Sequence, residues 1–525
     1  MTPAGTDATG TAGAPAVKAS TGSPDALLTE LRAALGADQV LCRDDGNDNP
    51  HPHRDSDLSG YEVDWRRRYH GRARAVLRPG TTAEVALVLR IAARHGASVV
   101  PQGGNTGLVG GGVPDGSGTQ LLLSLRRLNR IRALDAANLT LTVEAGCVLQ
   151  TAQQAAADAG LLLPLSLAAE GSCTIGGNLA TNAGGVQVLR HGNTRELCLG
   201  LEVVTPDGEV WDGLRGLRKD NTGYDLRDLY IGSEGTLGVI TAAVLKLQPQ
   251  PRAVLTALAT LASLADCVAL LQRAHAMAGA TLTAFEVMNA QSVALVRQHL
   301  PQAAVALPQA AVALPQAAVA HATPPSAAAA PAWTVLLELS DHEDEAHAQA
   351  VLERLLGAAI DAGEVNDAVV ASSRAQSNAI WQLRESIPLA QAADGLNIKH
   401  DIALPISATP DFVAATDAAL LRHRPGTRLV TFGHLGDGNL HYNVMAPLGE
   451  APADFLREQE AAINAIVYDR VVACGGSISA EHGIGELKRD ELARRQSPVA
   501  AALMRRIKQA LDPQNRLNPG RVLSE

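Results

Sequence analysis

Three glycine-rich segments constrain the fold of this 525-residue chain more than any other feature. They cover Gln102–Gly112, Glu170–Gly185 and Ile231–Thr241, and each follows a predicted strand. Repeated glycine lets backbone amides approach an anion closely, and successive amides form a concave site for phosphate. Three such loops, with asparagine, threonine and serine between the glycines, predict a large phosphate-bearing ligand of the nucleotide type.

Two common nucleotide-binding folds do not fit these loops. None of the three segments has the spacing G-x-G-x-x-G, and the chain contains no G-x-x-x-x-G-K-[ST]. The sequence therefore argues against a Rossmann fold and against a P-loop.

The length of the chain indicates more than one domain, because a single hydrophobic core rarely grows to 525 residues. A β-α-β pattern begins at Arg74–Arg78, and a capping box at Thr81–Glu84 starts its helix. The composition changes at Pro249–Pro251. We expect four parts, namely a disordered tail (1–24), a first domain (25–251), a second domain (252–485) and a C-terminal segment returning to the first domain (486–525).

The second domain is predicted to be α+β, because strands and amphipathic helices alternate in a way typical of an antiparallel sheet. One of its strands is expected at Ile402–Ile406. Leu300–Ala320 consists of three copies of Leu-Pro-Gln-Ala-Ala-Val-Ala, whose regular prolines forbid a continuous helix. We expect residues 300–331 to be a disordered or extended surface insertion without a chemical role.

Charge and composition exclude several classes of protein. With 44 Lys and Arg against 54 Asp and Glu, the net charge of −10 disfavours nucleic acid as a partner. The six cysteines are scattered without a Cys-x-x-Cys pair, as in a reducing compartment. The sequence shows no apolar run of about 18 residues and no signal-type apolar core in its first residues, so we expect a cytoplasmic protein without an integral membrane segment.

The stretch Phe432–Asn443 reads FGHLGDGNLHYN and predicts a β-hairpin that closes at Gly436–Asn439. In that hairpin His434 would face His441, with Cβ atoms about 4.5–5.5 Å apart, close enough for both imidazoles to bind one metal ion. The alternative is a hairpin with two surface histidines. Glu481-His482 offers a third ligand and a free base, which favours a catalytic metal site.

Several long motifs carry a resemblance to a known superfamily. Pro101–Pro114, Gly176–Gly185 and Gly232–Gly238 resemble the FAD-binding loops of the vanillyl-alcohol-oxidase-type flavoproteins. Within that superfamily, His434 and His441 followed by Glu481-His482 resemble the metal-dependent D-2-hydroxyacid dehydrogenases. The resemblance implies an α+β fold, with a two-subdomain FAD-binding domain and an α+β substrate domain built on an antiparallel sheet.

The resemblance also implies which residues bind FAD. The first loop would hold the pyrophosphate through Gln102, Gly103, Gly104, Asn105, Thr106, Gly107, Leu108 and Val109. The second would line the isoalloxazine and ribityl side through Gly171, Ser172, Gly176, Gly177, Asn178, Thr181, Asn182 and Gly185, and the third would close over the adenine half through Glu234, Gly238 and Ile240. Some members bond FAD covalently through a histidine where this chain has Gly104-Asn105-Thr106, so we expect non-covalent FAD.

For the reaction, the resemblance implies oxidation of a D-2-hydroxyacid to the 2-oxoacid, with hydride transfer to N5 of FAD. A divalent ion lowers the pKa of the substrate hydroxyl. His434, His441 and Glu481 are the expected ligands of zinc, although their ligand types also suit iron or manganese. His482 is the expected general base; on the residues alone, the roles of Glu481 and His482 are interchangeable.

Cationic and amide side chains are expected to bind the acid substrate. Arg384 and Lys399 occupy the positions of the family's carboxylate-binding segments, and Asn443 shares a strand face with His441. Pro388 stands where some dicarboxylate-specific members have a hydroxyl-bearing residue. D-2-hydroxyglutarate is the favoured substrate, as for the hydroxyglutarate-type branch, and D-lactate or glycolate is the alternative.

The resemblance leaves the partners and one other reaction class open. No NAD site is evident, so an electron-transfer flavoprotein or a quinone is the expected acceptor, and a homodimer is possible. The ether-lipid synthase branch of the superfamily uses FAD without net oxidation of its substrate. Reduction of the bound flavin by a D-2-hydroxyacid separates these two classes.

Overall fold

The computed structural model describes residues 25–43, 57–304 and 332–524 of the chain. The predicted N-terminal tail and most of the predicted insertion lie outside the described residues. Within that insertion, however, Pro301–Ala304 forms the 3-10 turn η3 and Ala303 is buried. The expectation of disorder or an extended chain is therefore wrong for these four residues, because the apolar Ala303 packs against neighbouring helices.

A four-stranded sheet, in the order β1-β2-β4-β3, carries the first glycine-rich loop at its end. Strands β2, β3 and β4 are parallel to one another and β1 is antiparallel to β2. Helix α3 begins as predicted, because the Thr81 hydroxyl accepts the amide of Glu84 and the Glu84 carboxylate accepts the amide of Gly80. The elements of this unit are α1 (Ala26–Leu35), β1 (Val40–Leu41), α2 (Ser59–Glu62), β2 (Ala75–Leu77), α3 (Thr82–Arg94), β3 (Val99–Gln102) and β4 (Leu121–Ser124).

A five-stranded antiparallel sheet, in the order β5-β6-β10-β8-β9, carries the second and third loops. Its central strands β8 and β10 are almost entirely buried, because both of their faces are covered. Its elements are β5 (Ile131–Asp135), β6 (Thr140–Glu144), α4 (Leu149–Asp158), α5 (Ile175–Thr181), α6 (Val188–His191), α7 (Thr194–Leu197), β8 (Cys198–Val204), β9 (Val210–Gly213), α8 (Leu226–Tyr230) and β10 (Val239–Lys246), and β7 (Leu161–Leu162) pairs with β11 (Gln248–Pro249).

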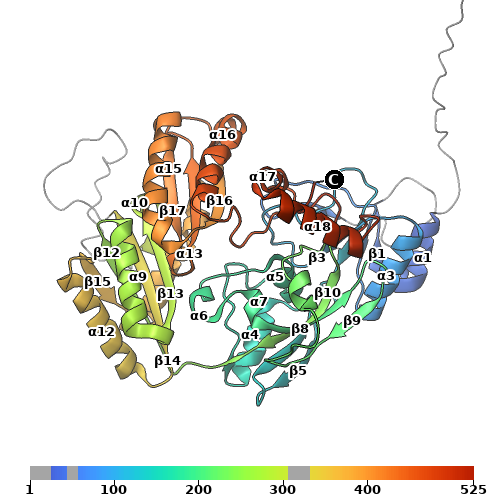
Figure 1. Cartoon of the computed structure of the whole chain (residues 1–525), viewed down its shortest axis with the longest axis horizontal. Helices are drawn as coiled ribbons and strands as arrows, with labels where there is room; N and C mark the ends of the chain where they lie inside the picture. Colours follow the sequence, from blue (N-terminus) through green and yellow to red (C-terminus); the bar gives the residue numbers. More distant parts are fainter. Residues whose placement is uncertain (1–24, 44–56, 305–331, 525) are drawn as a thin grey trace, which may run out of the picture.

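A seven-stranded antiparallel sheet forms the other lobe, as the alternating pattern predicted (Figure 1). Its order is β15-β12-β14-β13-β17-β18-β16, so β16 is an edge strand. The strands are β12 (Ala253–Leu261), β13 (Leu282–Asn289), β14 (Trp333–Asp341), β15 (Asp367–Val370), β16 (Asn397–Ala403), β17 (Arg428–His434) and β18 (Asn439–Met445).

Helices cover both faces of this sheet. One face packs against four helices, namely α9 (Leu264–Ala278), α12 (Glu345–Asp361), α15 (Thr409–His423) and α16 (Pro452–Ala473). The other face packs against three helices, namely α10 (Ala290–His299), α13 (Arg374–Glu385) and α14 (Ile387–Asp394).

After residue 483 the chain runs back over the first lobe, where α17 (Arg489–Arg495) and α18 (Pro498–Leu511) are drawn in dark red (Figure 1). The amide of Val99 donates to the carbonyl of Arg516, and the amide of Asn518 donates to the carbonyl of Val99. The Asn518 side chain also bonds the carbonyls of Gly111 and Glu234. These contacts support the division into domains near residues 251 and 485, which we keep as a proposal.

Two local predictions in the second lobe are wrong. The hairpin pairs His441 with Phe432 instead of His434, because the 3-10 turn η6 (Leu435–Asp437) lengthens the connection. Since Phe432 and His434 are two residues apart on β17, both still share a face with His441. The strand predicted at Ile402–Ile406 lies earlier, at β16, and ends where Leu404 turns towards the 3-10 turn η5 (Ile406–Ala408).

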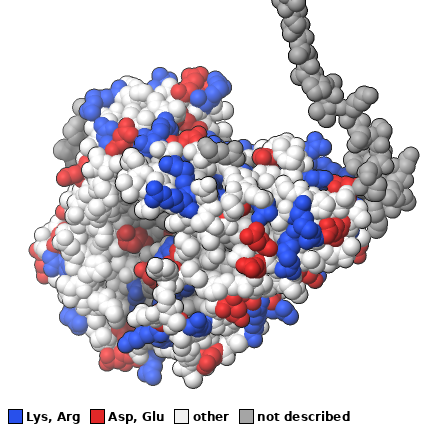
Figure 2. Space-filling view, turned by 45° about the vertical axis from the view of Figure 1, so that its right-hand side comes forward, with Lys and Arg blue, Asp and Glu red and all other residues white. Residues whose placement is uncertain are grey.

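Among the helices of the described ranges, none combines the length and the hydropathy that crossing a bilayer requires. On the face shown in Figure 2, basic and acidic side chains are interspersed, and the surface is hollowed between the two lobes.

One half-buried carboxyl in this lobe predicts a pH-dependent stability. Burial raises the pKa of Asp417 on α15 to about 6, against the opposing effect of the hydroxyl of Tyr442, which donates to it at 2.5 Å. A pKa raised on folding stabilises the protonated carboxyl, so this contribution is present below the unfolded pKa and is lost as pH rises through about 6.

We therefore expect Asp417→Asn, which stays neutral, to raise the free energy of unfolding by up to about 2 kcal/mol at pH 8. The difference should shrink towards zero at pH 4, measured by urea unfolding. Asp411→Asn, an exposed carboxyl on the same helix, is the control. A stabilisation by Asp417→Asn that is equal at both pH values would contradict the assignment.

Candidate active site

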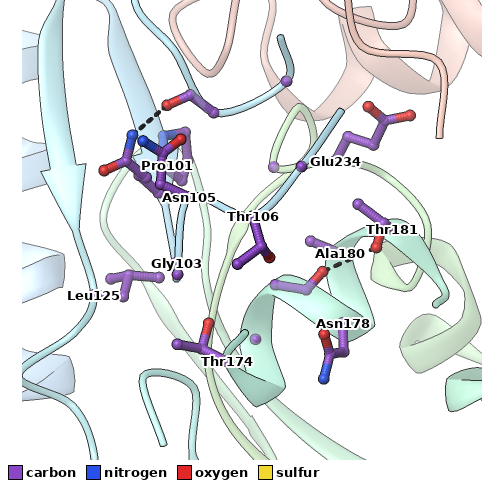
Figure 3. Close-up of a pocket in the computed structure, with 18 of the residues that line it drawn as sticks. Pro101, Gly103, Asn105, Thr106, Leu125, Thr174, Asn178, Ala180, Thr181 and Glu234 are labelled. Carbon is purple, nitrogen blue, oxygen red and sulfur yellow. Dashed lines mark hydrogen bonds between the residues drawn. The ribbon is translucent and has the colours of Figure 1, made fainter. Parts of the chain in front are cut away.

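The three glycine-rich loops converge on one cavity in the first lobe. The first and second loops face one another, as Thr106, Thr174 and Thr181 show in Figure 3. The second lobe contributes His482 to the same lining. The lining is Asp64, Pro101, Gln102, Gly103, Gly104, Asn105, Thr106, Gly107, Val109, Gly110, Gly111, Gly112, Val113, Leu125, Ala145, Thr174, Gly176, Gly177, Asn178, Ala180, Thr181, Glu234, Gly235, Gly238, Val239, Ile240 and His482.

The lining includes most, though not all, of the residues expected to bind FAD. All of the expected third-loop residues belong to it, as do all of the first-loop residues except Leu108. The expected residues outside the lining are Leu108, Gly171, Ser172, Asn182 and Gly185. Asn182 instead caps a local turn, its side-chain oxygen accepting the amide of Arg195.

Glycine is required where the first two loops lie against each other. A Cβ on Gly104 would lie 2.1 Å from the carbonyl oxygen of Ser172, and one on Gly103 would lie 2.4 Å from the hydroxyl oxygen of Thr174. Gly107 is different, because it is exposed and a Cβ there would meet no atom within 4 Å. The first loop is thus packed on one side and open on the other.

Two polar atoms in the cavity lining lack partners. The Gln102 side-chain oxygen and the Thr174 hydroxyl are buried and form no hydrogen bond within the described residues. A buried polar atom without a partner costs about 1–3 kcal/mol, so a bound ligand that supplies partners would offset this cost. This cavity, with backbone amides on several sides, fits a dinucleotide such as FAD.

A cluster of metal-ligating side chains lies where the second lobe meets this cavity. Ligand atoms of His434, His441 and Glu481 all lie within 4.8 Å of one another. The two imidazole rings have centroids 5.6 Å apart, and Nε2 of His434 is 3.9 Å from a carboxylate oxygen of Glu481. Two nitrogens and one oxygen at this spacing suit a divalent ion with open positions. The amide of Gly185 donates to Glu481 at 2.5 Å, which ties the cluster to the second glycine loop.

A second possible triad shares His441 and consists of Asp401, His441 and His482. In this triad both oxygens of the Asp401 carboxylate already accept hydrogen bonds. One oxygen of Asp401 accepts the amides of Glu481 and His482 at 2.9 Å each, and the other accepts the amide group of Asn439 at 3.0 Å. Glu481 has an oxygen without such bonds among the described residues. The donor chemistry therefore favours the triad with Glu481 over the triad with Asp401, and leaves the His482 ring outside that ligand set.

Outer carboxylates orient the two histidines of the hairpin. Nδ1 of His434 lies 2.5 Å from the buried carboxylate of Glu286 on β13. Although burial favours a neutral ring, Glu286 raises the pKa of His434 to about 9. Nδ1 of His441 lies 3.9 Å from Asp401. A carboxylate behind each imidazole is typical of metal-binding histidines, because it fixes the ring and leaves the other nitrogen for the ion.

His482 is held between the cluster and the cavity. Its ring stacks on His441 with centroids 6.0 Å apart, and its Nδ1 is 3.6 Å from Asp401. Burial lowers the pKa of His482 to about 4, against the opposing charge of Asp401. The imidazole is therefore neutral at pH 7, the state in which it can accept a proton.

The predicted substrate-binding residues differ in how they are held. Arg384 on α13 is buried, its Nε donates to Glu286 at 2.8 Å, and its guanidinium lies over the ring of Phe432. Lys399 and Asn443 are cross-strand partners and so share a sheet face. The Asn443 amide group donates to Gln391 at 3.0 Å, whereas Lys399 forms no side-chain hydrogen bond or ion pair within the described residues.

Sequence reasoning missed the residues that hold the ligands. Glu286 was detectable as a single acid within an otherwise apolar strand, and Asp401 stood in the Lys-His-Asp motif without a role. No sequence pattern predicted the hydrogen bonds of Glu234. Its carboxylate accepts the amides of Ile484 and Gly485, so the third glycine loop holds the chain just after His482.

Family models match both lobes. Residues 73–213 match the FAD binding domain, and residues 250–522 match the C-terminal domain of FAD linked oxidases. These matches support FAD as the ligand of the glycine loops.

Similar proteins of known name cover nearly the whole chain. Mitochondrial D-2-hydroxyglutarate dehydrogenase of Bos taurus is 39% identical over 468 residues, which is 89% of this chain and 80% of the bovine protein. D-2-hydroxyglutarate dehydrogenase of Xanthomonas citri pv. viticola is 40% identical over 471 residues, 89% of this chain and 93% of that protein.

Solved structures confirm the expected fold. Substrate-bound p-cresol methylhydroxylase superposes with a TM-score of 0.68 at 16% identity, over 94% of this chain and 96% of that one. The predicted vanillyl-alcohol-oxidase-type architecture, with a FAD-binding part and an α+β part, is thus confirmed. Together with the matched family models and relatives, it shows that this chain belongs to the FAD-linked oxidases and, among them, to the flavin-dependent D-2-hydroxyacid dehydrogenases.

Proposed function

We propose that this protein oxidises D-2-hydroxyglutarate to 2-oxoglutarate, using non-covalent FAD and a divalent ion, with zinc as the first choice. One observation carries the proposal. His482 lines the cavity of the glycine loops, and its ring also stacks on His441 of the ligand cluster. The proposed flavin site and the proposed metal site are therefore adjacent, with His482 between them. The relatives named above act on D-2-hydroxyglutarate, which supports the choice of substrate.

The two imidazoles and one carboxylate of the ligand cluster suit a divalent ion, and the cavity of the glycine loops suits FAD. His434, His441 and Glu481 would hold the ion, which would lower the pKa of the substrate hydroxyl and orient it. When bound, FAD supplies the acceptor for the hydride that leaves C2 of the substrate. The protein contributes position, charge and a base.

His482 is proposed to take the hydroxyl proton. With Nδ1 directed at Asp401, Nε2 is the nitrogen left to accept it, and the negative charge of Asp401 stabilises the imidazolium that results. Asp401 also holds the backbone amides of Glu481 and His482, so ligand and base keep a fixed relative position. Asn443 is proposed to bind the carboxylate next to the hydroxyl, and Arg384 and Lys399 to bind the acid substrate through their charge.

A smaller acid is the second candidate. Pro388 provides no hydroxyl at the start of α14, which weakens one expected contact to a remote carboxylate and leaves D-lactate or glycolate as the alternative. An electron-transfer flavoprotein or a quinone is proposed as the acceptor. A cytoplasmic location and a homodimer stay predictions, and the bovine relative carries the name of a mitochondrial protein.

The direct test measures initial rates on D-2-hydroxyglutarate, D-lactate, D-malate and glycolate with an artificial electron acceptor. We expect D-2-hydroxyglutarate to give the highest kcat/KM and to bleach the flavin spectrum under anaerobic conditions. Failure of every 2-hydroxyacid to reduce the flavin would refute the proposed function.

Removing a proposed ligand should remove the metal and the activity together. We expect His441→Ala and Glu481→Gln to lose turnover by about 100-fold or more, because the ion contributes several kcal/mol to the transition state. Metal content, measured by mass spectrometry, should fall while bound FAD persists. His423→Ala, an exposed histidine on α15, is the control. Full turnover after chelation, or in either ligand variant, would contradict the metal site.

Substitutions at two glycines of the first loop should distinguish an effect on folding from an effect on cofactor binding. Gly104→Ala should lower the melting temperature of the apoprotein, because its Cβ would lie against the Ser172 carbonyl. Gly107→Ala should leave that temperature unchanged and reduce FAD retention, since its Cβ would occupy space that the cofactor fills. Gly116→Ala, also open and outside the cavity lining, is the matched control. Equal FAD retention in Gly107→Ala and Gly116→Ala would mean that the first loop does not cover the cofactor.

A further inference from the structure

The proposed base His482 stands in a closed loop, Ile478–Lys488, which we call the base loop. Lys488 is buried and closes it. Its ammonium donates to the carbonyl of Ile478 at 2.9 Å, and its backbone amide donates to the carbonyl of Ile484 at 3.0 Å. Because the loop is tied to itself in this way, a shift at Ile484 also moves the short stretch that contains His482.

Glu234 of the third glycine loop holds the base loop from the opposite lobe. One oxygen of its carboxylate accepts the amide of Ile484 at 2.7 Å, and the other accepts the amide of Gly485 at 2.8 Å. In Figure 3 the buried side chain of Glu234 points away from Thr174 and towards the pale red ribbon of the C-terminal part of the chain. Both carboxylate oxygens are therefore used by the base loop, although the residue also lines the flavin cavity.

Gly483 separates two pairs of backbone amides in the base loop. The pair before it, which includes the amide of His482, donates to Asp401 of the second lobe, and the pair after it donates to Glu234 of the first. The φ of Gly483 is +80°, a conformation that favours glycine, and a Cβ on it would lie 2.8 Å from a carboxylate oxygen of Glu234. The close approach of the loop to this carboxylate thus requires glycine.

The backbone of Glu234 is strained and fixed in place. Its φ is +53°, in the left-handed region that glycine favours, and Gly235 follows it. Its amide donates to the carbonyl of Ala180, and its carbonyl accepts the side chain of Asn518. A strained residue where glycine would fit more easily indicates that its side chain has a task, and the bonds to the base loop supply one.

We propose that Glu234 is a positioning residue for the reaction centre, which keeps His482 and Glu481 in place beside the flavin cavity. This role differs from the contact with the adenine half of FAD that the resemblance implies for the same residue. A displacement of about 1 Å at a reaction centre can cost about 100-fold in rate, so the two amide bonds matter for turnover. The inference rests on the proposed function, because it takes His482 as the base and Glu481 as a metal ligand.

The first test compares Glu234→Gln with the wild-type holoenzyme. The substitution keeps the size of the side chain but replaces one acceptor oxygen with an NH2 group, which cannot accept a backbone amide. We expect kcat for D-2-hydroxyglutarate, per bound flavin, to fall by about 10–100-fold, with KM within about 3-fold. Loss of metal to a chelator should be about 10-fold faster, and FAD retention should stay within about 2-fold of the wild type. Asp490→Asn, which changes an exposed acid on α17, is the control.

Gly483→Ala disturbs the same contact from the side of the loop. Its Cβ would displace the Glu234 carboxylate, so we expect a fall in kcat and faster metal loss here as well. The double variant should lose less than the product of the two single losses, because both changes break one contact. Gly449→Ala is the matched control for backbone strain, since its φ is +85° and a Cβ there would meet no atom within 4 Å.

Hydrogen exchange distinguishes this role from a general loss of stability. In Glu234→Gln the amides of Ile484 and Gly485 should exchange about 10-fold faster, while the amides of β10 keep the wild-type rate. Loss of FAD with an unchanged kcat per bound flavin would assign Glu234 to the cofactor and overturn the proposal, as would unchanged exchange at the two amides. Inactivity of the wild type on every 2-hydroxyacid would instead refute the proposed function, and the exchange and metal-loss measurements would still decide the role of Glu234.

Discussion

The active site depends on one buried carboxylate, Asp401. It lies on the edge strand β16 with about 1% of its surface exposed. Although burial opposes its ionisation, the neighbouring His482 and Lys488 hold its pKa well below its usual range. Its oxygens accept the amides of Glu481 and His482 and the side chain of Asn439. A single charge therefore fixes the proposed base, one proposed ligand and the tip of the histidine hairpin.

The second supporting carboxylate, Glu286, performs a similar task from the centre of the sheet. It contacts His434 and Arg384 at the same time, and these two charges lower its pKa to about 2 even though burial opposes ionisation. Removing Glu286 would leave Arg384 and a protonated His434 buried without their shared counter-charge, and breaking a buried ion pair in this way costs about 3–5 kcal/mol. His434, the proposed metal ligand, and Arg384, the proposed substrate-binding cation, are thus coupled through Glu286. The changes in unfolding free energy caused by substituting them should therefore not be additive.

Both lobes are needed to complete the site. The chain after His482 is held by Glu234 of the third glycine loop, and Glu481 by the amide of Gly185 in the second. On the opposite side, Arg68 ties the first lobe to α16. These bonds position the proposed reaction centre of the second lobe against the glycine-loop cavity of the first.

Features that depend on backbone chemistry and local spacing could be read from the amino-acid sequence. The glycine loops, the Thr81 cap and the His434–His441 hairpin are properties of neighbouring residues, so a nucleotide-type ligand and a pair of neighbouring imidazoles followed from them, and the resemblance of these motifs to a known superfamily added FAD and the fold. The side chains that hold the histidines became visible only in the folded chain. Glu286 and Asp401 lie outside the hairpin in the sequence, and strand pairing places Glu286 opposite His434 and Asp401 opposite His441. Pairing between distant strands is not encoded in local sequence patterns.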